Sequence, residues 1–191
     1  MNYGKVIIVC APSGAGKSTI VKFLLKTFKT LSFSVSVTTR KIRSNEINGK
    51  DYYFISKEKF KKLIAKGNLI EWEEVYNGDF KGTLKSEVES FILKKRNIIF
   101  DVDVKGGISL KNYFKNSGLS IFIDVASIDV LENRLKVRGT ESIASIEERI
   151  LKANKEFKLK NNFDYIVLND DLNHTLSKLN RLVENFLNTE K

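Results

Sequence analysis

The stretch Ala11-Pro12-Ser13-Gly14-Ala15-Gly16-Lys17-Ser18 decides the fold of this chain. An apolar run, residues 6–10, precedes it, and apolar residues at helical spacing follow it between residues 20 and 28. A strand, a glycine-rich turn and a helix in this order are the setting that a phosphate-binding P-loop requires. The glycines let successive backbone N–H groups point at one anion, and the helix adds the positive end of its dipole. The sequence therefore predicts a P-loop after the first strand.

Two side chains of the predicted P-loop carry its chemistry. Lys17 supplies a mobile cation for the terminal phosphates, and Ser18 supplies a hydroxyl for Mg²⁺. Ala11 stands where the first glycine is usual, which requires a negative φ at that position. A chance match to a permissive form of the pattern occurs in about one or two chains per hundred of this length, and the flanking elements make it rarer. A mononucleotide with its metal is the predicted ligand, although the P-loop alone does not name the reaction.

Length and composition restrict the class of protein. The chain has 191 residues, 42% of them hydrophobic and 29% charged, which excludes a wholly disordered protein and allows one core with small subdomains. No apolar run approaches a membrane span, and no signal-peptide pattern is seen, so we expect a cytoplasmic protein that does not bind a membrane. The one cysteine, Cys10, is expected to be a buried thiol in a reducing compartment. His174 is expected on the surface of the last helix, and it has no Cys or His partners that would indicate zinc.

The formal net charge is +10, which suggests a polyanionic partner and brings nucleic acid into consideration. Many lysines, however, fall in the predicted helix at residues 57–66, where a solvated face explains them. Nucleotides are anions too, so an enzyme that gathers two of them would also be basic. Charge alone therefore leaves a nucleic-acid-binding NTPase as an alternative.

Strand-like and helix-like segments alternate along the chain, which indicates an α/β fold with a parallel sheet core and helices on both faces. The expected core strands are residues 5–10, 97–101, 120–125 and 164–168. The expected helices after them are residues 106–116, residues 128–137, and a last helix with an apolar stripe at Leu172, Leu176, Leu179, Val183 and Phe186. That stripe is expected to face the core.

Residues 33–83 interrupt this alternation. They contain short β-like pieces at residues 33–37, 51–55, 69–76 and 80–83. A helix lies among them at residues 57–66, with Ser56 as its N-cap. This pattern indicates a small inserted antiparallel unit.

Residues 138–145 are a second interruption, polar in character. Ser145 and Glu148, three residues apart, form a capping box that begins a helix running to about residue 160. A short polar loop between two helices favours a moving lid.

Polar clusters fall at the ends of the expected elements. Arg40 and Arg43 follow a predicted strand, and their guanidinium forks can converge on one phosphate group. Asp101 and Asp103 end a buried strand, where open α/β sheets bind their ligands, so these carboxylates are placed for a ligand or a metal. Further clusters are Glu71-Trp72, Gly82-Thr83, the arginines Arg134, Arg138 and Arg149, and Asn169-Asp170-Asp171.

The ordered set of these motifs resembles the guanylate kinase family, whose members move a phosphoryl group from ATP to GMP. The matching pieces are residues 12–19, 36–43, 49–52, 71–72, 82–83, 101–103, 138–140 and 169–170, which together cover nearly the whole chain. The resemblance implies the P-loop nucleotide-kinase fold and an ATP:GMP phosphotransferase of purine nucleotide metabolism. It also implies three parts: a core of residues 1–32, 84–131 and 160–191, a GMP-binding subdomain of residues 33–83, and a helical lid of residues 132–159.

By the same resemblance, the GMP site consists of Ser36, Arg40, Arg43, Tyr52, Glu71, Lys81, Thr83 and Asp101. Guanine presents N1–H and a 2-amino group as donors. The carboxylate of Glu71 can accept from both at once, and the hydroxyls of Ser36 and Thr83 complete the edge. Adenine lacks this donor pair and would leave Glu71 unpaired, a penalty of about 1–3 kcal/mol or more. The two arginines and Tyr52 are expected to hold the GMP phosphate.

The resemblance likewise assigns the ATP phosphates to the P-loop up to Thr19, and the adenine edge to Asn169. The implied catalytic residues, which surround the moving group with positive charge, are Lys17, Arg134, Arg138 and Arg149. Mg²⁺ is the implied cofactor, bound by Ser18 with Asp101 or Asp103 through water. The implied partners are ATP and GMP, with no nucleic acid and no membrane, for a monomer or a small homo-oligomer.

Two features depart from the family pattern. Lys81 stands where the family commonly has tyrosine, and the loop at residues 77–79 is one residue longer than in many members. A lysine at this position either brings a full charge to the GMP phosphate or points to solvent, and we expect the first.

Two further alternatives remain at this point. Guanylate-kinase-like modules of scaffold proteins bind peptides and typically lose the P-loop lysine or the arginines, whereas Lys17, Arg40 and Arg43 are present here. The other alternative is a P-loop kinase that acts on another phosphorylated sugar or nucleotide. Glu71 together with Thr83 and Asp101 favours guanine over that alternative.

Overall fold

The core of the chain, seen in a computed structural model that describes residues 4–44, 46–76, 78–138 and 142–189, is a parallel sheet in the order β2-β7-β1-β8-β9. β1 (Val6–Cys10) lies between β7 (Asn97–Val102) and β8 (Gly118–Asp124). β2 (Leu31–Phe33) pairs with β7, and β9 (Tyr165–Leu168) pairs with β8. The predicted parallel sheet is confirmed, with β2 as an additional strand. The stretch predicted to form a P-loop follows the carboxyl end of β1.

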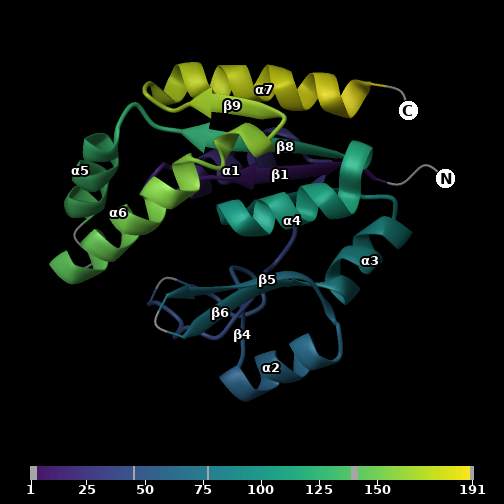
Figure 1. The fold of residues 1–191 in the computed structure, drawn as a ribbon. Helices are drawn as coiled ribbons and strands as arrows, with labels where there is room; N and C mark the ends of the chain where they lie inside the picture. Colours follow the sequence, from purple (N-terminus) through teal and green to yellow (C-terminus); the bar gives the residue numbers. More distant parts are fainter. Residues whose placement is uncertain (1–3, 45, 77, 139–141, 190–191) are drawn as a thin grey trace.

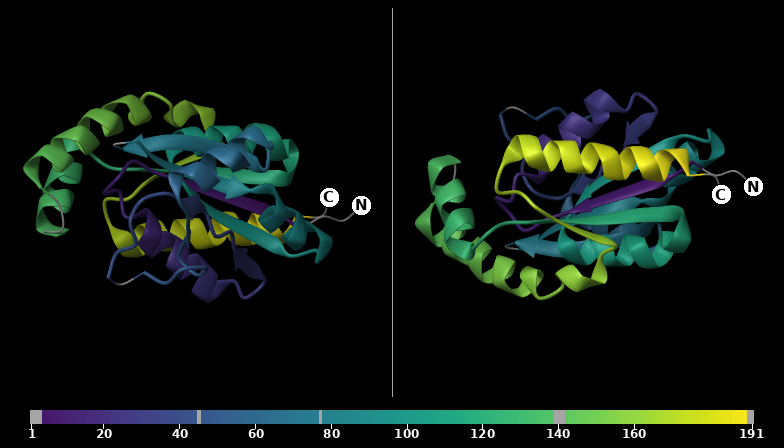
Figure 2. Two further views of the ribbon diagram at one scale, coloured as in Figure 1. Left: turned by 90° about the horizontal axis from the view of Figure 1, so that it is seen from below. Right: turned by 90° about the horizontal axis from the view of Figure 1, so that it is seen from above.

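Helices cover both faces of this sheet, as predicted (Figure 2). One face carries α1 (Lys17–Thr27) and α7 (Leu172–Asn188), and the other carries α3 (Lys85–Leu93) and α4 (Val104–Phe114). Because side chains alternate along a strand, Ile7 and Val9 pack in the core with α1 and α7, while Ile8 and Cys10 pack with α3 and α4. The apolar stripe of the last helix lies in the first of these cores, except that Leu172 is half-exposed. Burial raises the pKa of the Cys10 thiol, as expected for an inert cysteine.

A second sheet, in the order β4-β3-β6-β5, lies on the α4 side of the core (Figure 1). Its strands are β3 (Val37–Thr38), β4 (Tyr53–Phe54), β5 (Leu69–Tyr76) and β6 (Asp79–Leu84). β6 is antiparallel to β3 and β5, as predicted, whereas β3 and β4 are parallel. α2 (Lys57–Ala65) covers this sheet through the fully buried Phe60. The predicted N-cap is confirmed, since the Ser56 hydroxyl accepts from the N–H of Lys59 at 3.2 Å.

Two further helices, α5 (Ile128–Arg138) and α6 (Ile143–Phe157), project from the carboxyl edge of the main sheet (Figure 1). The helix predicted at residues 128–137 is therefore confirmed. Residues 139–141, which include most of the predicted 138–140 motif, lie outside the described residues. Single 3₁₀ turns, η1 (Lys115–Ser117) and η2 (Lys160–Asn162), precede β8 and β9. None of the helices described here has both the length and the apolar character needed to span a bilayer.

The predicted N-cap of α6 is wrong by three residues. Its N-cap is Ser142, whose hydroxyl accepts from the N–H of Ser145 at 3.3 Å, so Ser145 and Glu148 do not form the predicted capping box. Two serines three residues apart compete for the cap. The earlier one starts the helix, and Ile146 then falls on its buried face.

Two more differences come from competition between local signals. The helix predicted at residues 106–116 begins at Val104, because the carboxylate of Asp103 accepts from the N–H of Gly106 at 2.9 Å and caps the helix.

The predicted strand at residues 33–37 is wrong as a single strand. Phe33 ends β2 in the main sheet and Val37 begins β3 in the small one, so the chain passes between two sheets there. α3 was not predicted, since Val88 is its one buried residue.

The two ends of the described chain meet at one side of the molecule, away from α5 and α6 (Figure 1). The ammonium of Lys5 donates to the carbonyl oxygens of Phe186 at 2.6 Å, of Leu187 at 3.1 Å, and of Thr189. These carbonyls end α7 and lack helical partners, so the lysine satisfies them and complements the helix dipole.

Candidate functional site

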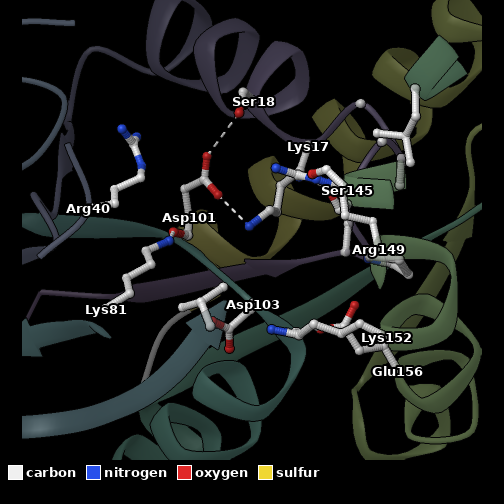
Figure 3. A pocket seen from close by; sticks show the side chains of 18 of the residues that line it. Lys17, Ser18, Arg40, Lys81, Asp101, Asp103, Ser145, Arg149, Lys152 and Glu156 are labelled. Carbon is white, nitrogen blue, oxygen red and sulfur yellow. Dashed lines mark hydrogen bonds and ion pairs between the residues drawn. The ribbon is translucent and has the colours of Figure 1, made fainter. Parts of the chain in front are cut away.

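A cavity of about 720 Å³ opens where the P-loop, the small sheet and α6 face one another (Figure 3). The P-loop residues 11–19 form one wall. Arg40, Arg43 and Tyr52 belong to the segment on the other side, and Arg149 reaches in from α6. Most of the side chains predicted from the sequence therefore converge on one space.

The backbone of the P-loop curls as the sequence predicts. Gly14 and Gly16 have φ values of 92° and 91°, and Ala11 is not among the described residues with positive φ. A Cβ on Gly16 would lie 2.7 Å from Nδ2 of Asn169, so close packing also requires glycine there. Asn169 in turn donates from Nδ2 to the carbonyl of Ala15 at 2.8 Å and supports the loop from behind.

Lys17, Ser18 and Asp101 form the centre of the cavity (Figure 3). Lys17 Nζ lies 2.5 Å from Asp101 Oδ1 and donates to the carbonyl of Val102 at 2.5 Å. Ser18 Oγ donates to Asp101 Oδ2 at 3.4 Å. Burial acts to raise the pKa of Asp101, but the ammonium groups of Lys17 and Lys81 outweigh burial and lower it. The carboxylate of Asp101 is therefore ionised beside a hydroxyl and an ammonium.

Three residues predicted to recognise guanine form a buried group beside the cavity. Thr83 Oγ1 donates to Glu71 Oε1 at 2.6 Å. Glu71, Thr83 and Ser36 are 6%, 1% and 4% exposed, and none is among the described residues that line the cavity. Burial raises the pKa of Glu71 to about 7, although the hydrogen bond from Thr83 opposes the shift. At a pH near 7, the Glu71 carboxyl group is therefore present in both its neutral and its charged form.

The residues predicted to bind the acceptor phosphate line the cavity together. Arg40 Cζ lies 4.8 Å from the centroid of the Tyr52 ring, within reach of a cation–π contact. Lys81 Nζ lies 5.4 Å from the same centroid and donates to the carbonyl of Asp101 at 2.9 Å. Burial acts to lower the pKa of Lys81, but Tyr52, Asp101 and other nearby acidic groups outweigh it and raise the pKa. Lys81 therefore points into the cavity and carries its charge there.

Two of the three predicted lid arginines also line the cavity. Arg149 Nη1 donates to the Ser13 hydroxyl at 2.5 Å, which connects α6 to the P-loop. Arg134 Nη2 donates to the carbonyl of Asn169 at 2.8 Å. The side chain of Arg138 lies outside the described residues. The side chain of Asn169 is buried against the P-loop. Its Oδ1 atom has no hydrogen-bond partner in the described part of the chain. The predicted contact of Asn169 with adenine stays a prediction.

Sequence reasoning missed an ionic group on α6 that also lines the cavity. Lys152 Nζ lies 3.3 Å from Glu73 Oε1 on β5 and 3.6 Å from Glu156 Oε1 on its own helix. Burial raises the pKa of Glu156 to about 7, and burial likewise raises the pKa of Glu73. The spacing of Arg149, Lys152 and Glu156 places them on one helix face, which was the available signal.

The arrangement of these parts identifies the class of protein. A P-loop at the carboxyl edge of a parallel sheet faces an arginine-rich site on an inserted sheet, and a helix pair reaches over both, which defines the P-loop kinases. A family profile described as "Guanylate kinase" matches residues 3–186. The chain belongs to the guanylate kinase family.

Individual relatives agree with this assignment. The chain is 44% identical over 183 residues to a guanylate kinase of Bacteroides fragilis, covering 96% of this chain and 90% of the relative. It is 44% identical over 184 residues to a guanylate kinase of Porphyromonas gingivalis, covering 96% and 98%. The crystal structure of guanylate kinase from Anaplasma phagocytophilum superposes with a TM-score of 0.79 at 28% identity, covering 98% of this chain and 88% of that one. A shikimate kinase of Bacteroides thetaiotaomicron, with a TM-score of 0.51 at 16% identity over 94% and 98% of the two chains, shares the fold.

Proposed function

We propose that this protein transfers the γ-phosphoryl group of ATP to GMP and releases ADP and GDP. The observation that carries the proposal is one cavity lined by the P-loop and by Arg40, Arg43 and Tyr52. A donor phosphate on the P-loop and an acceptor phosphate on the arginines would lie end to end in that cavity. Phosphoryl transfer requires alignment and positive charge around the moving group more than covalent chemistry by the protein.

In this proposal Glu71, Thr83 and Ser36 recognise the guanine base. The Thr83 hydroxyl fixes the Glu71 carboxylate at 2.6 Å, and that carboxylate accepts from N1–H and the 2-amino group. Because the three residues are buried beside the cavity, the small sheet has to shift relative to the core to admit the base. Arg40, Arg43, Tyr52 and Lys81 then hold the phosphate, and Asp101 completes the GMP site.

On the donor side, the ATP phosphates bind the P-loop N–H groups and Lys17, with Ser18 and Thr19 at the start of α1. Lys17 leaves Asp101 for the terminal phosphates, a short movement for a flexible side chain that lies 2.5 Å from that carboxylate. Arg134, Arg138 and Arg149 surround the moving group with further charge, and Asn169 contacts the adenine edge. Closing the cavity excludes water, which prevents simple hydrolysis of ATP.

The residues beside the P-loop fit Mg²⁺. Ser18 Oγ lies 3.4 Å from Asp101 Oδ2, and hydroxyl and carboxylate oxygens are the hard donors that Mg²⁺ prefers. Over the described ranges, no group of three or more His, Cys, Asp or Glu side chains is placed to hold a metal ion. Ser18 would hold Mg²⁺ directly, and Asp101 or Asp103 would hold it through water. An ion held by these residues would supply positive charge next to the phosphates.

Each of the three segments defined from the sequence has its own role in this proposal. Residues 33–83 act as the GMP-binding subdomain, residues 132–159 as the lid, and the rest as the core. The buried thiol of Cys10 supports a reducing compartment, the cytoplasm. The working form is a monomer or small homo-oligomer acting on nucleotides, with no nucleic acid or membrane as partner.

Incubating the purified protein with Mg-ATP and GMP, AMP, CMP or UMP in turn tests the proposal. We expect GDP from GMP, and turnover of AMP at least about 10²-fold lower, because AMP leaves the Glu71 carboxylate unpaired. Hydrolysis of ATP without formation of GDP would contradict the proposal. So would nucleotide binding without turnover, which would indicate a binding module. A salt-sensitive shift with oligonucleotides would support the nucleic-acid alternative.

A further inference from the structure

The guanidinium of Arg40 is held by a carboxylate that lies outside the cavity. Arg40 Nη1 donates to Glu46 Oε2 at 2.7 Å, and Nη2 donates to Glu46 Oε1 at 2.5 Å, so the pair is bidentate. The two side chains are 22% and 15% exposed. Arg40 lines the cavity, whereas Glu46 is not among the described residues that do. Glu46 therefore holds Arg40 from behind.

Within the described residues, a count of donors shows which edge of Arg40 can face a ligand. A guanidinium has five N–H donors. Nη1 gives its two to Glu46 and to the carbonyl of Lys41 at 2.9 Å, and Nη2 gives one of its two to Glu46. The other two donors, on Nε and Nη2, lie side by side on one edge of the plane. That is the edge that suits two oxygens of one phosphate. The hydrogen bond with Glu46, and to a lesser extent one with Tyr52, raises the pKa of Arg40, and Tyr52 also lines the cavity.

Aromatic rings fix the plane of the same guanidinium. Arg40 Cζ lies 4.8 Å from the centroid of Tyr52 and 5.4 Å from that of Phe54. The bidentate carboxylate sets its rotation, and the rings set its tilt. The guanidinium is therefore ordered in every direction before a phosphate arrives, which lowers the entropy lost on binding.

The same carboxylate orders the second phosphate-site arginine through its backbone. Glu46 Oε2 accepts from the N–H of Arg43 at 2.9 Å, and the N–H of Glu46 donates to the carbonyl of Arg43 at 3.0 Å. One side chain thus connects both arginines of the site. Glu46 carries the negative charge that this role requires, because the hydrogen bond from Arg40 lowers the pKa of Glu46 and keeps the carboxylate ionised.

We propose that Glu46 is the positioning residue of the acceptor-phosphate site, which fixes the Nε–Nη2 edge of Arg40 toward the GMP phosphate without touching GMP. This inference rests on the proposed function, because it takes GMP as the ligand. A competing arrangement is a placeholder, in which Glu46 must leave Arg40 before the phosphate can bind. The two differ in sign: removing a positioning residue weakens GMP binding, and removing a placeholder strengthens it.

The test compares GMP with guanosine, which has the same base and no phosphate. Dissociation constants for both are measured by calorimetry on wild-type protein and on Glu46→Gln, which keeps the size of the side chain and removes its charge. We expect the preference for GMP over guanosine to fall about tenfold or more in Glu46→Gln, about 1.4 kcal/mol. The KM for GMP rises in parallel, while kcat at saturating GMP changes much less. Each preference is a ratio from one preparation, so a lower folded fraction does not alter it.

Two further variants separate positioning from loop stability. In Arg40→Met, the additional change Glu46→Gln is expected to have little further effect on the preference, because the contact with Arg40 is already absent and a glutamine oxygen can still accept from the N–H of Arg43. Asp51→Asn is the matched control, since Asp51 is a carboxylate of the same loop that accepts from the N–H of Ile47 at 2.8 Å. We expect it to lower the melting temperature and leave the preference for GMP unchanged.

The outcomes are distinct. An unchanged or increased preference for GMP in Glu46→Gln overturns the inference, and an increase supports the placeholder. An equal loss in the Arg40→Met background also overturns it, since Glu46 would then act on the phosphate by another route. A wild-type protein that binds GMP no better than guanosine contradicts the proposed function itself, which keeps the two failures apart.

Discussion

At the scale of single residues, Lys17 connects the two halves of the cavity, since it starts α1 and pairs with Asp101 at the end of β7. We predict that Lys17→Ala lowers kcat at least about 10³-fold, because the terminal phosphates lose their mobile cation. Circular dichroism should show that the fold survives. Lys22→Ala, which changes an exposed lysine of the same helix, is the control and should leave kcat unchanged. Near-normal turnover in Lys17→Ala would contradict the proposed role of Lys17 in phosphoryl transfer.

The raised pKa of Glu71 predicts a pH dependence of substrate use. In the proposed function, the Glu71 carboxylate accepts from two guanine donors, and its protonated form cannot do so. We therefore expect kcat/KM for GMP to fall as the pH is lowered through about 7, the pKa to which burial raises this group. Glu71→Gln should remove this inflection and lower kcat/KM at all pH values. An inflection that persists in that variant would assign it to another group, such as Glu156.

The raised pKa of Glu71 affects the stability of the fold in the opposite direction from its effect on GMP use. The pKa of Glu71 is higher in the folded protein than its usual value of 4.5, so the native state binds this proton more tightly than the unfolded state does. The stabilisation is complete below the usual pKa and is lost as the pH rises through about 7. Glu156, with its pKa also raised to about 7, contributes in the same direction. Thermal melts across this range should show both contributions, and Glu71→Gln should flatten part of the dependence.

Lys81 is the residue at which this chain departs from the family pattern. Its ammonium points into the cavity, between the carbonyl of Asp101 and the ring of Tyr52. We predict that Lys81→Ala raises the KM for GMP about tenfold and leaves the KM for ATP unchanged, because a charged hydrogen bond to the GMP phosphate contributes about 1.5–3 kcal/mol. An unchanged KM for GMP would show that the lysine has no role in binding.

At the scale of elements, Lys152 connects α6 to β5 through Glu73. We predict that Lys152→Met lowers the free energy of unfolding by about 3 kcal/mol, because it leaves two largely buried carboxylates without their shared cation. Lys105→Met is the control, since Lys105 lies 3.9 Å from the same carboxylate with a side chain that is 69% exposed, and should cost less than about 1 kcal/mol. Urea denaturation measures both. Equal losses in the two variants would contradict the prediction that the buried ion pairs of Lys152 contribute more than the exposed ion pair of Lys105.

The elements that the sequence predicted well are those whose signals are local. The P-loop conformation depends on glycines within eight residues, and the buried strand before it is apolar on both faces. The start of α6 was misplaced because Ser142 and Ser145 are equally good caps by residue type, and the sequence alone does not show which of them begins the helix. The strand at residues 33–37 was misplaced because its apolar alternation is shared between two sheets.

The candidate site was predictable to a similar degree. Spacing alone could not bring Ser36, Glu71 and Thr83 together, since they come from three segments, and the family resemblance supplied that grouping. Lys152 and Glu156 were missed because charges on a polar helix are usually solvated. Glu46 was missed because nothing in a polar loop indicates which arginine a carboxylate will contact.

At the scale of the whole molecule, the cavity lies between three parts that have to approach one another for transfer. In the proposed function, the small sheet opens to admit GMP to the buried residues Glu71, Thr83 and Ser36 and closes again for transfer, while α6 stays close to the P-loop through the Arg149–Ser13 contact. We predict that the radius of gyration falls when an unreactive ATP analogue and GMP are both bound, and falls less with either alone. Small-angle X-ray scattering measures this. Equal values in all states would contradict closure.

The contact of Lys5 with the end of α7 brings the two chain ends together on the side remote from the cavity. A short flexible peptide could therefore join them, and the backbone could be cut instead at Gly67, an exposed turn whose Cβ position has no neighbour within 4 Å. Such a circular permutant would keep every strand pairing while reversing which half of the molecule is synthesised first. Tags or surface attachments placed at either end of the described chain would likewise stay clear of the cavity.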